Sequence, residues 1–182
     1  MADIREPEPV KLLVGMLSAF PDALAAAEAE LYAEFGPVDL RTEILPHEFT
    51  DYYADEMGAP LSRVFVAYER LIDPGRLSEI KRATNAAERR LAASGRWLAA
   101  RPVNLDPGYV APAKLVLASC KDYTHRIYLA AGVYAEPTLA YTRGRWVCYD
   151  WTYPDYRTAE YQAFFDRVRG QLMTQRREGR TA

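Results

Sequence analysis

The stretch RIYLAAGVYAEPTLAYTRGRWVCY, residues 126–149, decides the predicted fold class. It contains three strand-like segments separated by glycine turns: Arg126–Leu129, Val133–Tyr141 and Arg145–Tyr149. Strands that follow one another through turns at Gly132 and at Gly144 form an antiparallel meander. Pro137 lies in the middle segment and cannot donate to a strand ladder, which predicts an edge position or a bulge there.

Toward the N-terminus of this meander, strand and helix patterns alternate. The predicted elements are a strand over Val10–Ala19, a helix over Phe20–Phe35, strands over Val38–Leu45 and Leu61–Ile72, and a helix from Asp73-Pro74 to Gly95. The sequence NLDPGY, Asn104–Tyr109, is predicted to be a turn because Asp, Pro and Gly adjoin in it. Ala113–Cys120 is too short for its periodicity to separate strand from helix.

The chain is expected to close with an amphipathic helix capped by Thr158. Its apolar stripe is Tyr161, Phe164, Phe165, Val168 and Leu172. The separate runs of strands predict an α+β fold with a mixed or antiparallel sheet, and the β-α-β-β-α opening is compatible with a ferredoxin-like half. We expect a disordered N-terminus over 1–9, one domain over 10–173, and a polar, Arg-rich tail over 174–182.

Composition excludes several classes of function. The 182 residues carry a formal net charge of −2, which argues against a dedicated nucleic-acid binder. No apolar run reaches the roughly 20 residues needed to cross a bilayer, and the acidic, Pro-rich start is unlike a secretory signal. With only Cys120 and Cys148 available, a disulfide framework is not expected, so we expect a cytoplasmic protein. Neither a P-loop nor a G-x-G-x-x-G motif is present, so no nucleotide-cofactor motif is found.

The densest polar cluster is KDYTHR, residues 121–126. Lys121 and Arg126 suit the oxygens of a phosphate or carboxylate, and His125 suits general acid–base chemistry. Asp122 lies between them as a candidate acid–base group. The alternative is that this segment is a solvated connection with no specific role.

Two carboxylates elsewhere could complete such a site. Asp106 lies in the predicted NLDPGY turn, where it could face a ligand or shape the turn. Glu136 shares a strand face with Tyr134 and could pair with His125 or Arg126, or protect an exposed strand edge. We therefore expect the residues around 121 to point into a hollow shared with positions 106 and 136.

The segment WTYPDYRT, residues 151–158, is rich in aromatic side chains. Tyr156, or Tyr134 of the meander, could stack on a ligand or offer its hydroxyl. Arg157 could add a polar contact, although packing of the loop is the alternative. His47 and the acidic patch over 51–56 leave a divalent cation open, but no metal-site spacing is present and no metal ligand is assigned.

Taken together, these segments resemble an uncharacterised prokaryotic family, domain of unknown function 4416. The resemblance extends from about Val10 to Gln171 and is carried by ERLIDPG, EIKRATN, NLDPGY, KLVLAS, KDYTHRIYL, GVYAE and WTYPDYRT. It implies a small, cytoplasmic, single-domain protein and supplies no catalytic residues. Some members carry a GTP-binding label, but this sequence lacks both the P-loop and the N-K-x-D element that such a label requires.

The sequence therefore predicts binding, with hydrolysis or transfer as an option, of an anionic small molecule such as a nucleotide or sugar phosphate. Whether the protein is an enzyme is left open at this point. The alternative is a non-catalytic interaction or assembly protein that uses the aromatic C-terminal region and the last helix. A homo-oligomer is compatible with either function.

Overall fold

The computed structural model describes residues 3–48 and 54–179. Within these residues the fold is mixed α+β, as predicted, and the strands pair antiparallel in one sheet. The elements are, in chain order, β1 (Val10–Ser18), α1 (Pro21–Phe35), β2 (Val38–Arg41), β3 (Leu45–His47), α2 (Ala54–Met57), β4 (Leu61–Ile72), the 3-10 turn η1 (Pro74–Arg76), α3 (Leu77–Ala93), β5 (Asn104–Ala111), β6 (Lys114–Ser119), β7 (Ile127–Ala130), β8 (Val133–Thr142), β9 (Arg145–Cys148), the 3-10 turn η2 (Asp155–Arg157) and α4 (Ala159–Glu178).

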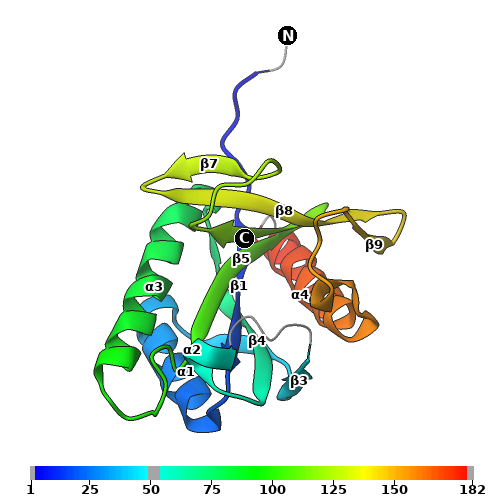
Figure 1. Cartoon of the computed structure of the whole chain (residues 1–182). Coiled ribbons are helices and arrows are strands. Elements are labelled where there is room, and N and C mark those ends of the chain that lie inside the picture. Colours follow the sequence, from blue (N-terminus) through cyan, green and yellow to red (C-terminus); the bar gives the residue numbers. More distant parts are fainter. Residues whose placement is uncertain (1–2, 49–53, 180–182) are drawn as a thin grey trace.

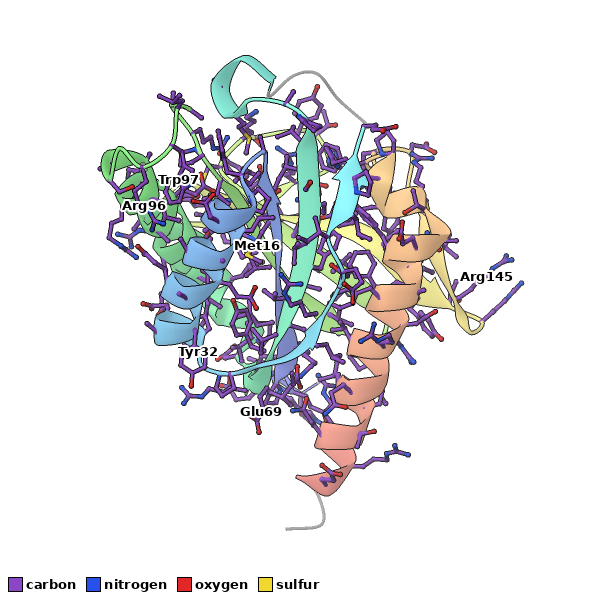
Figure 2. The ribbon with its side chains drawn as sticks, turned by 90° about the horizontal axis from the view of Figure 1, so that it is seen from below. Met16, Tyr32, Glu69, Arg96, Trp97 and Arg145 are labelled. Atoms are coloured by element: carbon purple, nitrogen blue, oxygen red, sulfur yellow. The ribbon has the colours of Figure 1, made fainter. Side chains whose placement is uncertain are left out.

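The sheet is sandwiched between helices. Its strands adjoin in the order β2-β4-β1-β5-β6-β8-β7, and in addition β3 pairs with β4 and β9 pairs with β8. Helices α1 and α3 lie on one face and α4 lies on the other (Figures 1 and 2). The side chains between sheet and helices form one core on each face.

Strand β1 is buried along its whole length because it lies in the middle of the sheet. Leu12, Val14 and Met16 belong to the core under α1 and α3, whereas Leu13 belongs to the core under α4. A strand covered on both faces needs apolar residues at consecutive positions. This explains the apolar run that identified the strand in the sequence.

The apolar stripe of α4 packs against the sheet of its own chain. Each of its five residues is buried: Tyr161, Phe164, Phe165, Val168 and Leu172. Phe65 of β4 contacts three of these rings from the sheet, with ring centroids 4.8 to 5.9 Å apart. The apolar face of the last helix is therefore covered within the chain.

The segment predicted as one strand over Val38–Leu45 is interrupted. Strands β2 and β3 both pair with β4, and the residues between them are not in a strand. At the interruption the hydroxyl of Thr42 accepts a hydrogen bond from the backbone N–H of Phe65 at 3.0 Å. A side chain thus takes over one bond of the strand ladder.

The C-terminal part of the sheet agrees with the predicted meander of β7, β8 and β9. Between Pro137 and Leu139 the register of β8 against β6 shifts by one residue, which is the bulge expected at this proline. Helix α4 continues through Glu178, beyond the predicted domain end at 173. Near this end the Arg176 guanidinium donates to the backbone carbonyl of Pro9 at 2.9 Å, which ties the helix to the N-terminal segment.

Candidate functional site

The candidate site lies where β5 and β6 separate. Strand β5 pairs with β1 over Asn104–Val110, but it pairs with β6 only from Gly108 onward, opposite Leu117. Beyond that pair, β6 follows β8 instead, with Ser119 opposite Tyr134. We call the point beyond the Gly108–Leu117 pair the β5–β6 fork.

The structure shows that the turn predicted for NLDPGY, residues 104–109, is wrong. These residues belong to strand β5. Pro107 and Gly108, two residue types that normally indicate turns, each fit the strand for a specific reason. Pro107 has no N–H to donate and stands where pairing with β6 ends, a position that proline tolerates. A Cβ at Gly108 would lie 2.4 Å from the carbonyl oxygen of Val116, so only glycine allows the strands to approach this closely.

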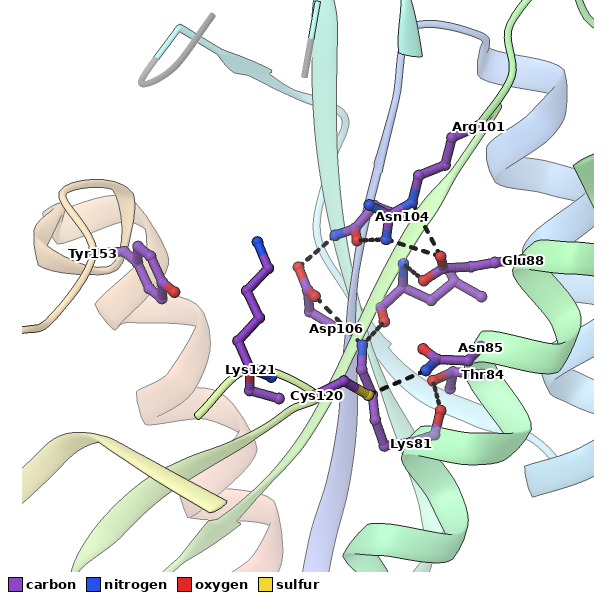
Figure 3. Close-up of polar contacts among 12 residues, drawn as sticks. Lys81, Thr84, Asn85, Glu88, Arg101, Asn104, Asp106, Cys120, Lys121 and Tyr153 are labelled. Carbon is purple, nitrogen blue, oxygen red and sulfur yellow. Dashed lines mark hydrogen bonds and ion pairs between the residues drawn. The ribbon is translucent and has the colours of Figure 1, made fainter. Parts of the chain in front are cut away.

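A cavity of about 570 Å³ opens at the fork. Side chains of β4, β5, β6 and β8, of α3, and of the segment around η2 line it. Figure 3 shows Lys121 extending from the end of β6 into the space between Tyr153 and Asp106. Residues far apart in the sequence thus meet around one opening.

Helix α3 replaces the missing strand partner of β5. Lys81 donates to the carbonyl of Leu105 at 2.8 Å, and Glu88 accepts from the N–H of the same residue at 2.8 Å. Glu88 also pairs with Arg101 at 2.9 Å, and Arg101 donates to the side-chain oxygen of Asn104. Backbone groups that β6 would otherwise pair are satisfied by charged side chains that also line the cavity (Figure 3).

Arg63 of β4 connects two carboxylates at the inner end of the cavity. It is buried, with Nη1 3.3 Å from Oδ2 of Asp106 and Nη2 3.6 Å from Oδ2 of Asp155. Lys81 lies 3.7 Å from the other oxygen of Asp106, and Asn104 donates to Oδ2 of Asp106 at 2.6 Å. The carboxylate of Asp106 is therefore held in a fixed orientation, with its side chain 31% exposed toward the cavity.

The surroundings move the pKa values of these two carboxyl groups in opposite directions. Burial alone would raise the pKa of Asp106, but the charges of Lys81 and Arg63 and the hydrogen bond from Asn104 lower it below its usual value. Burial raises the pKa of Asp155 in spite of the charge of Arg63. The two carboxyl groups thus differ in how readily they hold a proton.

His47 lies beside this pair, with Nδ1 3.8 Å from Oδ2 of Asp155. Burial and then the charge of Arg63 lower the pKa of His47 to about 4, against the opposing effect of Asp106. Its imidazole is therefore neutral near pH 7. It adds no charge to the inner end of the cavity.

On the β8 side the cavity is closed by a second carboxylate network. Buried Glu136 accepts from Nε of Arg126 at 2.7 Å and lies 3.2 Å from Nε2 of His125. Arg126 also donates to the hydroxyl of Tyr153 at 2.9 Å and to the carbonyl of Lys121 at 2.9 Å. This network joins the 121–126 segment to the loop before α4.

Of the residues predicted from the sequence, five line this cavity: Asp106, Lys121, Arg126, Glu136 and Tyr156. His125 does not line it, because its ring stacks on Trp151 at 4.8 Å and reaches Glu136 from the outer side. Tyr134 does not line it either and packs edge-on against Tyr128, with centroids 5.4 Å apart.

The last two predicted residues also lie outside the cavity lining. Asp122 is exposed on the connection between β6 and β7. Arg157 donates to the carbonyls of Tyr149, Asp150 and Thr152 at 2.8 to 3.0 Å, so it shapes the loop before α4.

Several residues of the cavity were not predicted from the sequence. They include Arg63, Lys81, Glu88, Arg101 and Asn104. Arg63 stands among apolar residues of a strand, and Lys81 lies on the same side of its helix as the apolar stripe, being four residues after Leu77. A charged residue at a core-facing position is the signal that could have identified both.

Charge around the cavity favours anions. Among the described lining residues there are six cations and four carboxylates: Arg63, Lys81, Arg89, Arg101, Lys121 and Arg126 against Glu88, Asp106, Glu136 and Asp155. The lining thus has two positive charges in excess, whereas the whole chain has a net charge of −2. An excess of one sign of charge in a cleft raises the local concentration of ligands of the opposite sign.

Within residues 3–48 and 54–179, no group of three or more His, Cys, Asp or Glu side chains could hold a metal ion. Residues 51–53, half of the acidic patch over 51–56 that the sequence suggested beside His47, lie outside the described residues. No helix in the described part of the chain is long and apolar enough to cross a membrane.

Comparison with known proteins identifies a family but no relative of known activity. The model of a family described as "Domain of unknown function (DUF4416)" matches residues 8–171. No curated protein and no solved structure matches the chain.

Proposed function

The chain belongs to the family described as a domain of unknown function (DUF4416), and we propose that it binds an anionic small molecule in the cavity at the β5–β6 fork. The observation that carries this proposal is the surplus of cations in a lining that comes from distant parts of the sequence. A cavity of about 570 Å³ is within the range of small-molecule sites, roughly 300–1,000 Å³.

Lys121 is proposed to contact the anionic group. It extends into the opening from the end of β6, and its side chain carries a charge that a phosphate or carboxylate can meet (Figure 3). Arg89 lines the same cavity from α3. Arg126 is proposed to position this segment through Glu136, because its guanidinium is already engaged by that carboxylate.

The proposal is tested by thermal denaturation in the presence of inorganic phosphate and of phosphorylated sugars and nucleotides. We expect the melting temperature of the wild-type protein to rise, because a ligand that binds only the folded state stabilises it. Lys121→Glu should remove the rise, whereas Lys114→Glu, at the exposed opposite end of β6, should retain it. A panel in which no anion raises the wild-type melting temperature would contradict the proposal.

A second candidate function, turnover of the bound molecule by hydrolysis or transfer, is supported by the two carboxyl groups beside Arg63. Environments that separate the pKa values of two neighbouring carboxyl groups are typical of acid–base pairs. Asp155 would exchange the proton and Asp106 would stay ionised. Release of phosphate from a bound ester should then be lost in Asp155→Asn while binding persists. Turnover that is unchanged in this variant would contradict the role.

Two finer assignments are also proposed. The opening β1-α1-β2, β4-α3-β5 is proposed to be ferredoxin-like, which is supported by the strand order β2-β4-β1-β5 with both helices on one face. A cytoplasmic location is supported by the two free cysteines, Cys120 and Cys148. A solved structure with another strand order, or fractionation into another compartment, would contradict these assignments.

A further inference from the structure

The cavity has two chemically different sides. Figure 3 shows Lys121 and Tyr153 on one side of the opening, and Asp106, Asn104 and Asn85 on the other. The first side carries the cation proposed to meet the anionic group. The second side offers the carboxylates of Asp106 and Glu88 and the side-chain amides of two asparagines. The cations on this side, Lys81 and Arg101, are paired with those carboxylates, Lys81 with Asp106 at 3.7 Å and Arg101 with Glu88 at 2.9 Å.

Asp106 restricts which part of a ligand can approach it. Its carboxylate is ionised near pH 7, because its pKa is lowered by Lys81 and Arg63 against the effect of burial. An ionised carboxylate accepts hydrogen bonds and repels another anion. Repulsion by Asp106 therefore favours an anionic group near Lys121, with hydrogen-bond donors such as hydroxyl groups facing Asp106.

The aromatic residues near the cavity do not form a site for a nucleobase. Trp151 does not line the cavity, and its ring already stacks on His125 at 4.8 Å and on Tyr149 at 4.7 Å. Tyr156 is 2% exposed and stacks on Phe165 with centroids 5.7 Å apart.

Among the described lining residues, Tyr153 is the one aromatic residue with an exposed ring, at 46%. Its hydroxyl is already bonded to Arg126. A single ring at the rim can contact one side of a sugar or base, but it cannot enclose a base between two faces.

We infer that the ligand is a phosphorylated sugar or polyol, with its phosphate near Lys121 and its hydroxyl groups donating to Asp106. This inference rests on the proposed binding of an anion at the β5–β6 fork. The carboxylate is preorganised for the task, since Arg63, Lys81 and Asn104 hold it from three directions.

The inference is tested by isothermal titration calorimetry of the wild-type protein with four probes. They are ribose 5-phosphate, inorganic phosphate, ribose and adenosine 5′-monophosphate. Ribose 5-phosphate should bind at least about tenfold more tightly than each of the other three, because it alone combines the anion with an unencumbered sugar.

Asp106→Asn provides the second measurement. Removal of the negative charge should strengthen binding of inorganic phosphate and reduce the preference for ribose 5-phosphate to less than about threefold. The matched control is Asp166→Asn, an exposed aspartate of α4, which should leave the preference unchanged. Circular dichroism and a melting curve establish that each variant is folded.

The outcomes separate the two proposals. If none of the phosphorylated probes binds, the proposed function fails and the inference fails with it. If inorganic phosphate binds as tightly as ribose 5-phosphate, or if the nucleotide binds more tightly than the sugar phosphate, the inference fails while anion binding stands. The wild-type measurements alone decide between these cases, so the test does not depend on any variant folding.

Discussion

Replacement of Arg63 by methionine should destabilise the fold by about 3–5 kcal/mol, the usual cost of removing one partner from a buried ion pair. The arginine is 5% exposed, and its side chain lies 3.3 Å from Asp106 and 3.6 Å from Asp155. In the variant Asp106 still has Lys81 at 3.7 Å. Asp155 keeps the backbone N–H of Tyr156 at 3.1 Å and the imidazole of His47 at 3.8 Å but loses the guanidinium charge, so most of the cost arises from Asp155.

The assay is urea denaturation followed by tryptophan fluorescence at pH 7. The expected loss corresponds to a decrease in melting temperature on the order of 10 °C for a domain of this length. The double variant Arg63→Met with Asp155→Asn should recover at least about half of the loss, since the buried charge is then gone.

The pH dependence gives an independent check on the same variant. Arg63 lowers the pKa of Asp155, so its removal raises that pKa further above the unfolded value. Protonation of Asp155 in the folded variant then restores stability as the pH falls through the raised pKa. The penalty of Arg63→Met should therefore be smaller at pH 5 than at pH 7. A penalty below about 1 kcal/mol at pH 7, or no recovery in the double variant, would refute the claim that the charge of Arg63 stabilises the buried carboxylates of Asp106 and Asp155.

Three further predictions concern stability. Gly108→Ala should lower the free energy of unfolding by about 2 kcal/mol or more, because its Cβ would lie 2.4 Å from a backbone oxygen. Gly170→Ala, with open space around it in α4, should raise the free energy of unfolding by up to about 1 kcal/mol. Equal melting temperatures of the two variants would contradict this prediction. His47 has a pKa lowered to about 4 by burial and the neighbouring guanidinium, so the unfolded chain binds a proton there between pH 6.5 and 4 and the folded protein does not. The free energy of unfolding should therefore fall by about 2–3 kcal/mol between pH 7 and 4.5 because of His47. In urea titrations at both pH values, His47→Gln should lack this decrease. An unchanged pH dependence in the variant would contradict the role of His47. Phe165→Ala, at a fully buried ring, should cost about 3–5 kcal/mol in the same assay, and Tyr32→Ala, at a ring 59% exposed, about 0.5 kcal/mol or less.

Elements with a strong apolar pattern were predicted closely from the sequence. Strand β4 has the predicted bounds, Leu61–Ile72, and every residue of the predicted α4 stripe is buried. In both cases the local pattern and the tertiary environment require the same residues. The local sequence pattern is then sufficient to predict the element.

The β5–β6 fork could not be predicted in this way. Asp, Pro and Gly at 106–108 have the composition of a turn, and what makes them a strand is non-local. Pairing with β1 and the close approach of Val116 at Gly108 appear only once the sheet has formed. The local preference is overridden by the tertiary environment.

The candidate site was predicted in part for the same reason. Lys121 and Arg126 belong to a local cluster of charges, and the strand pattern suggested Glu136 as a partner for that cluster, so these residues could be identified from the sequence. Arg63 and Lys81 lie within a strand and a helix, where the signal is one charge at a core-facing position and is weaker than a cluster of charges. Their burial depends on strands and helices that are distant in the sequence.

The most direct test of the central claim is a crystal structure of the wild-type protein with ribose 5-phosphate bound. We expect the phosphorus atom within the opening at the β5–β6 fork, with Lys121 next to it and sugar hydroxyl groups donating to Asp106. A sugar phosphate seated at any other surface, with that opening filled only by solvent, would contradict the account.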